Sequence, residues 1–240
     1  MDYFTSDETW LKVNLEAVRR FPEILFFPGF WAEYGMCTEP SAFGSRCTWP
    51  EEELPFAHKI IRDAGDMRAL DKPDPATDGL CPFVLKRLRR CQARIERAGH
   101  ALRFAVSRGP WNIASFLMGT TEFLTALHTE ARSVCRLLEV ITEFICSWLS
   151  LQKETFPSIE GVFILDDIVG MVGEEDFRHF ALPYLAKIFT ALTVKVKFFH
   201  NDAEGRVCAG YLPDIGVNLF NFGPRHGLAE MKRLTGNRLA

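Results

Sequence analysis

The sequence lacks the features that define several large classes of protein. Its 240 residues carry 28 Lys and Arg against 31 Asp and Glu, a net charge of −3, so it has no positive excess to attract nucleic acids or anionic membranes. No apolar run reaches the roughly 18 residues of a membrane span. The start, MDYFTSDETW, has neither the basic residues nor the apolar stretch of a signal peptide. We therefore expect a soluble, cytoplasmic protein that acts on a small molecule, without a nucleic-acid or membrane partner.

Two common motifs are also missing. The seven cysteines include no CxxC pair, and an odd number fits poorly with a closed disulfide framework. Most of them lie on apolar helical faces, where packing is the expected role, whereas Cys37 and Cys47, in a long loop, remain possible metal ligands. No GxGxxG motif follows the first predicted strand, so the usual signature of a dinucleotide site is absent.

What is present is an alternation of strand and helix patterns. Short apolar runs predict strands at 23–27, 101–106, 161–165, 194–199 and 217–220, and helical periodicity predicts helices at 6–20, 51–62, 83–98, 111–127, 129–152, 174–192 and 228–234. This alternation is typical of a parallel sheet covered by helices, either doubly wound or closed as a barrel.

The positions of the polar residues favour the barrel. They follow the carboxyl ends of successive strands, where TIM barrels build their sites: Arg108, Asp166, Asp167, His200, Asp202 and Asn221. Only five strands can be counted, and residues 236–240 resemble the start of a sixth. We therefore predict a single domain over 1–240, an α/β TIM-type (β/α)8 barrel that is truncated at its C-terminus, with a long insertion at 29–82 after the first strand.

Two groups of side chains could carry chemistry at this edge. His200 and Asp202, at i and i+2 on extended backbone, can converge on one metal ion, although a histidine can also satisfy a strand end by ordinary hydrogen bonding. One carboxylate of the pair Asp166 and Asp167 should point towards the barrel axis, unless the pair only caps the following turn. We expect Asp167 and His200 to be catalytic and Asp166 to bind substrate.

Other residues are candidates for binding. Arg108 precedes Gly-Pro and a predicted helix, so the guanidinium and the helix N-terminus could hold a substrate anion; the alternative is a surface arginine beside a turn. Asn221 could orient a ligand or satisfy backbone groups, and Trp31 and Tyr34 could line a pocket or belong to the core. The basic run within 83–98 could bind phosphate, but a solvated outer helix face is the preferred interpretation.

Three segments of the chain together form a recognisable pattern. They are Arg108-Gly-Pro-Trp-Asn-Ile-Ala114 with Phe116-Leu-Met-Gly119, Phe163-Ile-Leu-Asp-Asp-Ile168 with Glu174-Glu-Asp-Phe177 and Pro183-Tyr184, and Phe198-Phe-His-Asn-Asp202. These segments resemble the uroporphyrinogen decarboxylase superfamily, which also contains zinc-dependent, corrinoid-linked methyltransferases. The likeness runs from about 100 to 238 and, more weakly, from 22 to 80.

The details of the resemblance favour the methyltransferase branch. The decarboxylases of the superfamily bind the carboxylates of the porphyrinogen through an N-terminal arginine motif. The corresponding residues 28–34 of this chain contain no arginine. The methyltransferases of the superfamily bind zinc through H-x-C and a later cysteine. Here His200 matches, Asp202 replaces the cysteine, and the later ligand would fall beyond residue 240. The resemblance thus implies a zinc site at His200 and Asp202, a corrinoid protein as partner, and methyl transfer to or from a small substrate. Decarboxylation of a porphyrinogen or smaller acid, and a non-catalytic role in docking a corrinoid protein, remain the alternatives.

Overall fold

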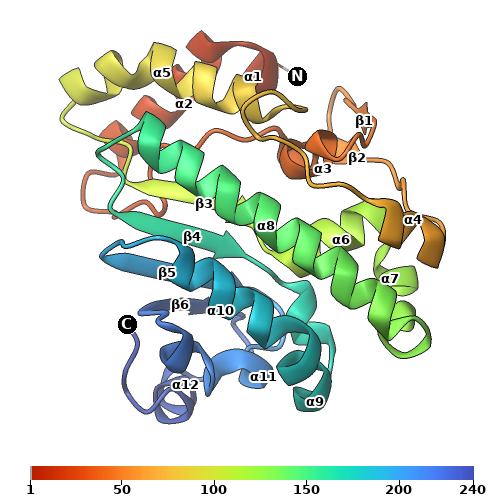
Figure 1. Cartoon of the computed structure of the whole chain (residues 1–240). Helices are drawn as coiled ribbons and strands as arrows, with labels where there is room; N and C mark the ends of the chain where they lie inside the picture. The colour runs from red at the N-terminus through yellow and green to blue at the C-terminus, as the bar shows by residue number, and fades with distance from the viewer. Residues whose placement is uncertain (1) are drawn as a thin grey trace.

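The computed structural model describes residues 2–240 and contains a parallel sheet whose strands are ordered as in the chain. The sheet consists of β3 (Phe104–Arg108), β4 (Gly161–Leu165), β5 (Val196–Asn201) and β6 (Leu219–Phe222) (Figure 1). A minor antiparallel pair, β1 (Cys47–Thr48) and β2 (Phe56–Ala57), lies in the long insertion. The predicted α/β class is confirmed, and the sheet remains open between β3 and β6 rather than closing into a barrel.

Helices of very different lengths surround this sheet. The helices are α1 (Asp2–Thr5), α2 (Asp7–Arg20), α3 (Thr38–Ala42), α4 (Ala64–Ala69), α5 (Cys81–Arg97), α6 (Pro110–Met118), α7 (Thr120–Thr129), α8 (Ala131–Thr155), α9 (Glu174–Asp176), α10 (Leu182–Ala191), α11 (Arg206–Ala209) and α12 (Leu228–Leu234). Short 3-10 segments occur at η1 (Gly35–Cys37), η2 (Ile168–Met171) and η4 (Leu212–Ile215), and a π-helical segment, η3 (Phe177–Ala181), leads into α10.

The two faces of the sheet belong to different hydrophobic clusters. Side chains such as Ile164 and Phe199 point towards α8 and α10, which lie across one face (Figure 1), and join a core that extends from Trp10 to Leu239. The alternate side chains Val106, Phe163 and Phe198 form a small separate cluster on the opposite face. We call this opposite face the inner face, because it corresponds to the inside of a β/α barrel, where side chains alternate between lumen and helices.

Most of the predicted helices are confirmed, with shifted ends. The first begins one residue later than predicted because Ser6 is the N-cap, accepting a hydrogen bond from the Thr9 amide at 3.1 Å. The helix predicted at 111–127 is divided at Gly119, whose φ of 105° breaks the helical path between α6 and α7.

Two predicted elements are wrong. Residues 23–27 form no strand, and Leu25 is 77% exposed, because this apolar run has no neighbouring strand with which to form a hydrogen-bonded ladder. Residues 51–62 form no helix; this stretch contains β2, and Pro55 interrupts the backbone hydrogen bonding that a helix would need. The main sheet therefore has four of the five predicted strands. Residues 236–240 are not a strand either, although Ala240 exchanges backbone hydrogen bonds with Phe220 and Asn218 beside β6.

Side chains occupy the free edge of β3. The Gln152 amide, from α8, accepts from the Val106 amide and donates to the Val106 carbonyl, both at 2.9 Å, as a neighbouring strand would. The next amide along this edge of β3, that of Arg108, donates to Glu39 Oε1 at 3.0 Å. Gln152 and Glu39 are both buried, so this edge is satisfied without another strand.

We expect Gln152→Met to lower the free energy of unfolding by about 2 kcal/mol, because it leaves two buried backbone groups of Val106 without partners. Urea unfolding followed by circular dichroism measures this loss. Gln92→Met on α5 is the control, since Gln92 bonds only to Glu96 in an exposed setting. Equal stability of both variants would contradict the role given to Gln152.

Among residues 2–240, no helix combines the length and the apolar character needed to cross a lipid bilayer.

Candidate functional site

The sheet register brings three of the predicted site residues onto one line. Arg108 of β3 pairs with Leu165 of β4, Leu165 with His200 of β5, and His200 with Asn221 of β6. These residues form the row of the inner face nearest the carboxyl ends of the strands. The row below it is apolar and contains Val106, Phe163 and Phe198. The polar side chains of Arg108, His200 and Asn221, which we call the rim, thus lie next to an apolar row. Polar groups beside an apolar surface are expected of a small-molecule site.

His200 lies beside two carboxylates. Its Nε2 is 3.4 Å from Asp202 Oδ2 and 3.8 Å from Asp167 Oδ1, and its side chain is 20% exposed. The Asp202 amide donates to Asp167 Oδ1 at 2.7 Å, which fixes the loop after β5 against the loop after β4. The structure therefore brings together the predicted catalytic pair, Asp167 and His200, and the predicted metal ligand Asp202.

The geometry fits part of a metal site. Two ligands about 2 Å from a tetrahedral zinc ion are about 3.3 Å from each other, close to the distance between His200 Nε2 and Asp202 Oδ2. Asp167 Oδ1 lies 3.8 Å from His200 Nε2, but this oxygen already accepts the Asp202 amide. Within residues 2–240 no group of three or more His, Cys, Asp or Glu side chains is arranged to hold a metal. The pair is thus a partial donor set.

Asp166 does not face the inner side of the sheet. It is fully buried, and its carboxylate accepts from the Trp111 amide at 3.1 Å and the Asn112 amide at 2.8 Å, at the start of α6. Burial raises the pKa of this carboxyl to about 8, against the opposing effect of the two backbone donors. Asp166 is thus placed as a helix cap, with no surface for a substrate contact.

The same contacts correct the prediction for the N-terminus of α6. The amides of Trp111 and Asn112 bond to Asp166, and the Ile113 amide bonds to Gly109 O. Because Pro110 has no amide hydrogen, the first turn has no free donor for a substrate anion.

Arg108 is held between two glutamates. Its Nη2 is 2.8 Å from Glu33 Oε2 and its Nη1 is 3.6 Å from Glu39 Oε2; 12% of the Arg108 side chain is exposed. Burial would lower the arginine pKa, but the two carboxylates raise it above its ordinary value, so the guanidinium stays charged. Burial raises the pKa of Glu33, against the lowering effect of Arg108. With one arginine between two carboxylates, this cluster has little capacity left to attract an anion.

Two supporting residues were not predicted. Glu39 binds the Arg108 amide, and its role depends on a contact across 69 residues of sequence. Asn112 accepts from the amides of Asp167 and Ile168 and donates to Leu165 O, so it shapes the loop that presents Asp167. The only sequence signal for Asn112 is its place in the Gly-Pro-Trp-Asn segment that carries the family resemblance.

The remaining predicted binding residues, Trp31, Asn221 and Tyr34, do not all lie at the same site. Trp31 lies over the inner face, with its ring 6.1 Å from that of Phe163 in an edge-on arrangement. Asn221 is exposed at the end of the row. Tyr34, in contrast, is buried beside Arg87 of α5, whose guanidinium carbon is 4.9 Å from the tyrosine ring centre, in a different pocket. The basic run that contains Arg87 is therefore not simply a solvated face.

A family model described as uroporphyrinogen decarboxylase (URO-D) matches residues 1–240. The chain belongs to the URO-D family. Curated relatives named uroporphyrinogen decarboxylase are similar along much of the chain. The protein from Thioalkalivibrio sulfidiphilus is 25% identical over 256 residues, covering 100% of this chain and 69% of its own length. That from Cellvibrio japonicus is 27% identical over 201 residues, covering 80% of this chain and 53% of its own.

The solved structure of another protein has the same fold. A methyltransferase from Methanosarcina mazei superposes with a TM-score of 0.78 at 18% identity, over 97% of this chain and 68% of that protein. The chain thus spans about half to two thirds of the length of these URO-D relatives and of this structure. The open sheet is the corresponding part of a β/α barrel, as the polar residues at its strand ends predict.

Proposed function

We propose that this protein is a metal-dependent methyltransferase of the URO-D family. His200 and Asp202 would hold a divalent metal, expected to be zinc, and a methyl group would move between a corrinoid bound to a partner protein and a small substrate. The observation that carries the proposal is the approach of His200 Nε2 to the carboxylates of Asp202 and Asp167 on the inner face. A bound zinc ion would supply a Lewis acid for the heteroatom that gains or loses the methyl group.

The protein's own side chains would prepare the site for this reaction. Asp167 orients the loop that carries Asp202 by accepting its amide hydrogen. Trp31 and Phe163 provide an apolar wall beside His200, whose ring is 5.9 Å from that of Phe163. Such a wall excludes water and so strengthens electrostatic interactions at the metal ligands.

Decarboxylation of a porphyrinogen is the second candidate, because the curated relatives are named for it. Binding of a polycarboxylate needs several unpaired cations. In the rim described above, the arginine is already paired with Glu33 and Glu39, and the other charged groups beside His200 are carboxylates. This charge distribution supports a metal cation more than a substrate with many carboxylates.

Metal binding is the first test. We expect the protein to bind one equivalent of Zn²⁺, measured by calorimetry and elemental analysis. His200→Ala and Asp202→Ala should each weaken binding by at least about tenfold, because each removes a ligand. His128→Ala is the matched control, since His128 Nε2 is also 3.4 Å from an aspartate oxygen, of Asp176, but lies outside the site. Equal metal content in wild type and His200→Ala would remove His200 as a ligand.

Activity is the second test. The protein is mixed with a methylated corrinoid carrier and small thiols as acceptors, and the cobalamin absorbance is followed with and without a chelator. Demethylation that requires both metal and His200 supports the proposal. Carbon dioxide release from uroporphyrinogen without metal would establish the decarboxylase instead, and corrinoid-protein binding without either reaction would establish a docking role.

A further inference from the structure

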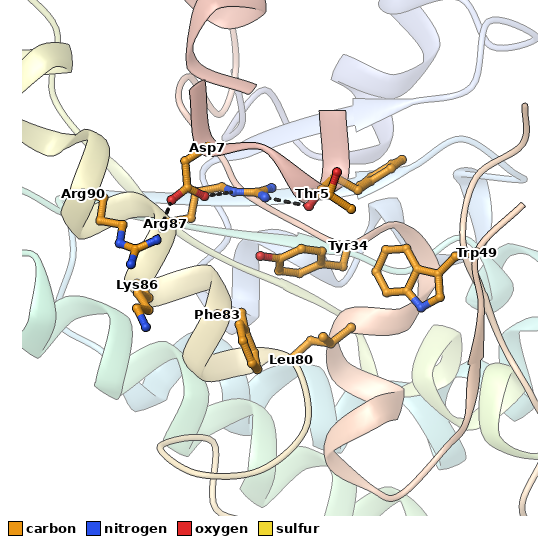
Figure 2. A pocket seen from close by; sticks show the side chains of 10 residues that line it. Thr5, Asp7, Tyr34, Trp49, Leu80, Phe83, Lys86, Arg87 and Arg90 are labelled. Atoms are coloured by element: carbon orange, nitrogen blue, oxygen red, sulfur yellow. Dashed lines mark hydrogen bonds and ion pairs between the residues drawn. The ribbon is translucent and has the colours of Figure 1, made fainter. Parts of the chain in front are cut away.

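A second pocket lies outside the inner face, where the N-terminal helices meet α5. It has a volume of about 670 Å³, within the range of small-molecule sites. Its walls come from segments far apart in the sequence: α1 and α2, the stretch around Tyr34 and Trp49, and the first turns of α5 (Figure 2). The proposed methyl-transfer reaction uses none of these residues.

The charged side chains of this pocket are mostly positive. Lys86, Arg87 and Arg90 line it together with one carboxylate, that of Asp7, so two positive charges are in excess. Asp7 pairs with both Arg87 and Arg90 (Figure 2). Its Oδ1 is 3.0 Å from Arg87 Nε and its Oδ2 is 3.2 Å from Arg90 Nη1. Within residues 2–240 no carboxylate pairs with Lys86, which is exposed. The pocket therefore has a positive field despite the slightly acidic chain.

Arg87 is the buried member of these three cations. The side chain is 2% exposed, donates to Phe4 O at 2.6 Å and lies over the Tyr34 ring. Its buried Nη1 has no hydrogen-bond partner in the part of the chain that the structure describes. Because Arg87 shares the single carboxylate of Asp7 with Arg90, an anion bound in the pocket would further stabilise its buried charge.

Aromatic rings form the rest of the wall. The rings of Phe4 and Tyr34 are 6.2 and 5.9 Å from that of Trp49, both edge-on. On α5, Phe83 is 55% exposed and lies one turn before Lys86 and two turns before Arg90. Residues three and four apart share a helix face, so an aromatic ring and two cations are presented side by side.

We propose that this pocket binds a planar aromatic molecule that carries a carboxylate, sulfonate or phosphate group. The ring lies against Phe83 and Trp49, and the anionic group pairs with Lys86 and Arg90. Stacking on the aromatic walls and charge pairing each favour such a ligand over a neutral aromatic or a simple inorganic anion.

Calorimetry with two matched probes tests this proposal. We expect naphthalene-2-sulfonate to bind at one site, and naphthalene-2-sulfonamide, which has the same ring but no charge, to bind at least about tenfold more weakly. Inorganic sulfate alone should bind more weakly still, because it lacks the ring. The double variant Lys86→Ala/Arg90→Ala should reduce sulfonate affinity by at least about tenfold, and Phe83→Ala should weaken both aromatic probes.

Arg89→Ala is the matched control. It removes one positive charge from the same helix, against two in the double variant, and Arg89 is exposed and does not line the pocket. Circular dichroism of each variant verifies the fold. Equal affinity for sulfonate and sulfonamide, an equal effect of Arg89→Ala, or no sulfonate binding by the folded protein would each overturn the proposal. Zinc binding at His200 is measured separately, so this result is independent of the proposed activity.

Discussion

Arg108→Met is expected to lower the free energy of unfolding by about 3–5 kcal/mol at neutral pH, because it leaves the buried carboxylate of Glu39 and the partly buried carboxylate of Glu33 without their cation. Chemical unfolding measures the change. Arg103→Met, immediately before β3, is the control: Arg103 pairs with Glu160 on the surface and is 60% exposed, so its loss should cost less than about 1 kcal/mol. Similar losses for both variants would contradict the structural role of Arg108.

The pH dependence of the Arg108 variant has a definite sign. Burial already raises the pKa of Glu33 in the folded protein, and loss of Arg108 raises it further. An acid with a raised folded-state pKa contributes stability at low pH and loses it as the pH rises through that pKa. The difference in stability between wild type and Arg108→Met should therefore shrink on acidification. Adding Glu33→Gln to Arg108→Met should recover part of the loss at neutral pH.

Asp166→Ala is expected to lower the free energy of unfolding by about 3 kcal/mol, because it removes a helix cap and leaves two buried amides, of Trp111 and Asn112, without acceptors. Asp166→Asn keeps one acceptor oxygen and should lose less. Asp214→Asn is the control, since Asp214 is 68% exposed and pairs with Arg238. An unchanged unfolding midpoint for Asp166→Ala would refute the capping role.

Titration of Asp166 provides a second measurement. Burial raises its pKa from an ordinary 3.8 to about 8, so its contribution to stability is complete below about pH 4 and is lost as the pH rises through about 8. Wild type should thus lose stability between these limits by a process that Asp166→Asn lacks. Unfolding curves for both proteins at about pH 5 and about pH 8.5 compare the slopes; equal slopes would show that Asp166 does not titrate in this interval.

Local sequence patterns were sufficient for much of the fold and for the rim of the site. The strand predicted at 161–165 is correct because its continuous apolar run is buried on both faces. The helix predicted at 129–152 corresponds to Ala131–Thr155, because its apolar residues follow helical spacing and are buried. Arg108, His200 and Asn221 share a row because parallel strands in register bring their carboxyl ends to one edge. By contrast, residues 23–27 have a strand-like composition, but a strand also needs a partner.

The parts that could not be predicted depend on contacts between distant residues. Nothing near Arg108 in the sequence shows that Glu33, 75 residues earlier, neutralises it. Asp166 and Asp167 are equivalent by composition, and only the packing of α6 against the end of β4 directs Asp166 towards the first turn of α6 as a cap. The partners of the basic run of α5 could not be recognised for the same reason, because Asp7 and Glu8 lie 80 or more residues away from the arginines that they bind.

The Gln152 side-chain amide, which lies along β3, makes the two edges of the sheet differ in how they can pair with a further strand. An incoming strand cannot pair with Val106, because Gln152 already occupies both of its backbone groups. At the opposite edge, the backbone of Ala240 already bonds beside β6. The partner at Val106 is a side chain, which ends the ladder there and blocks strand exchange at that position. The partner beside β6 is main chain, which continues the ladder.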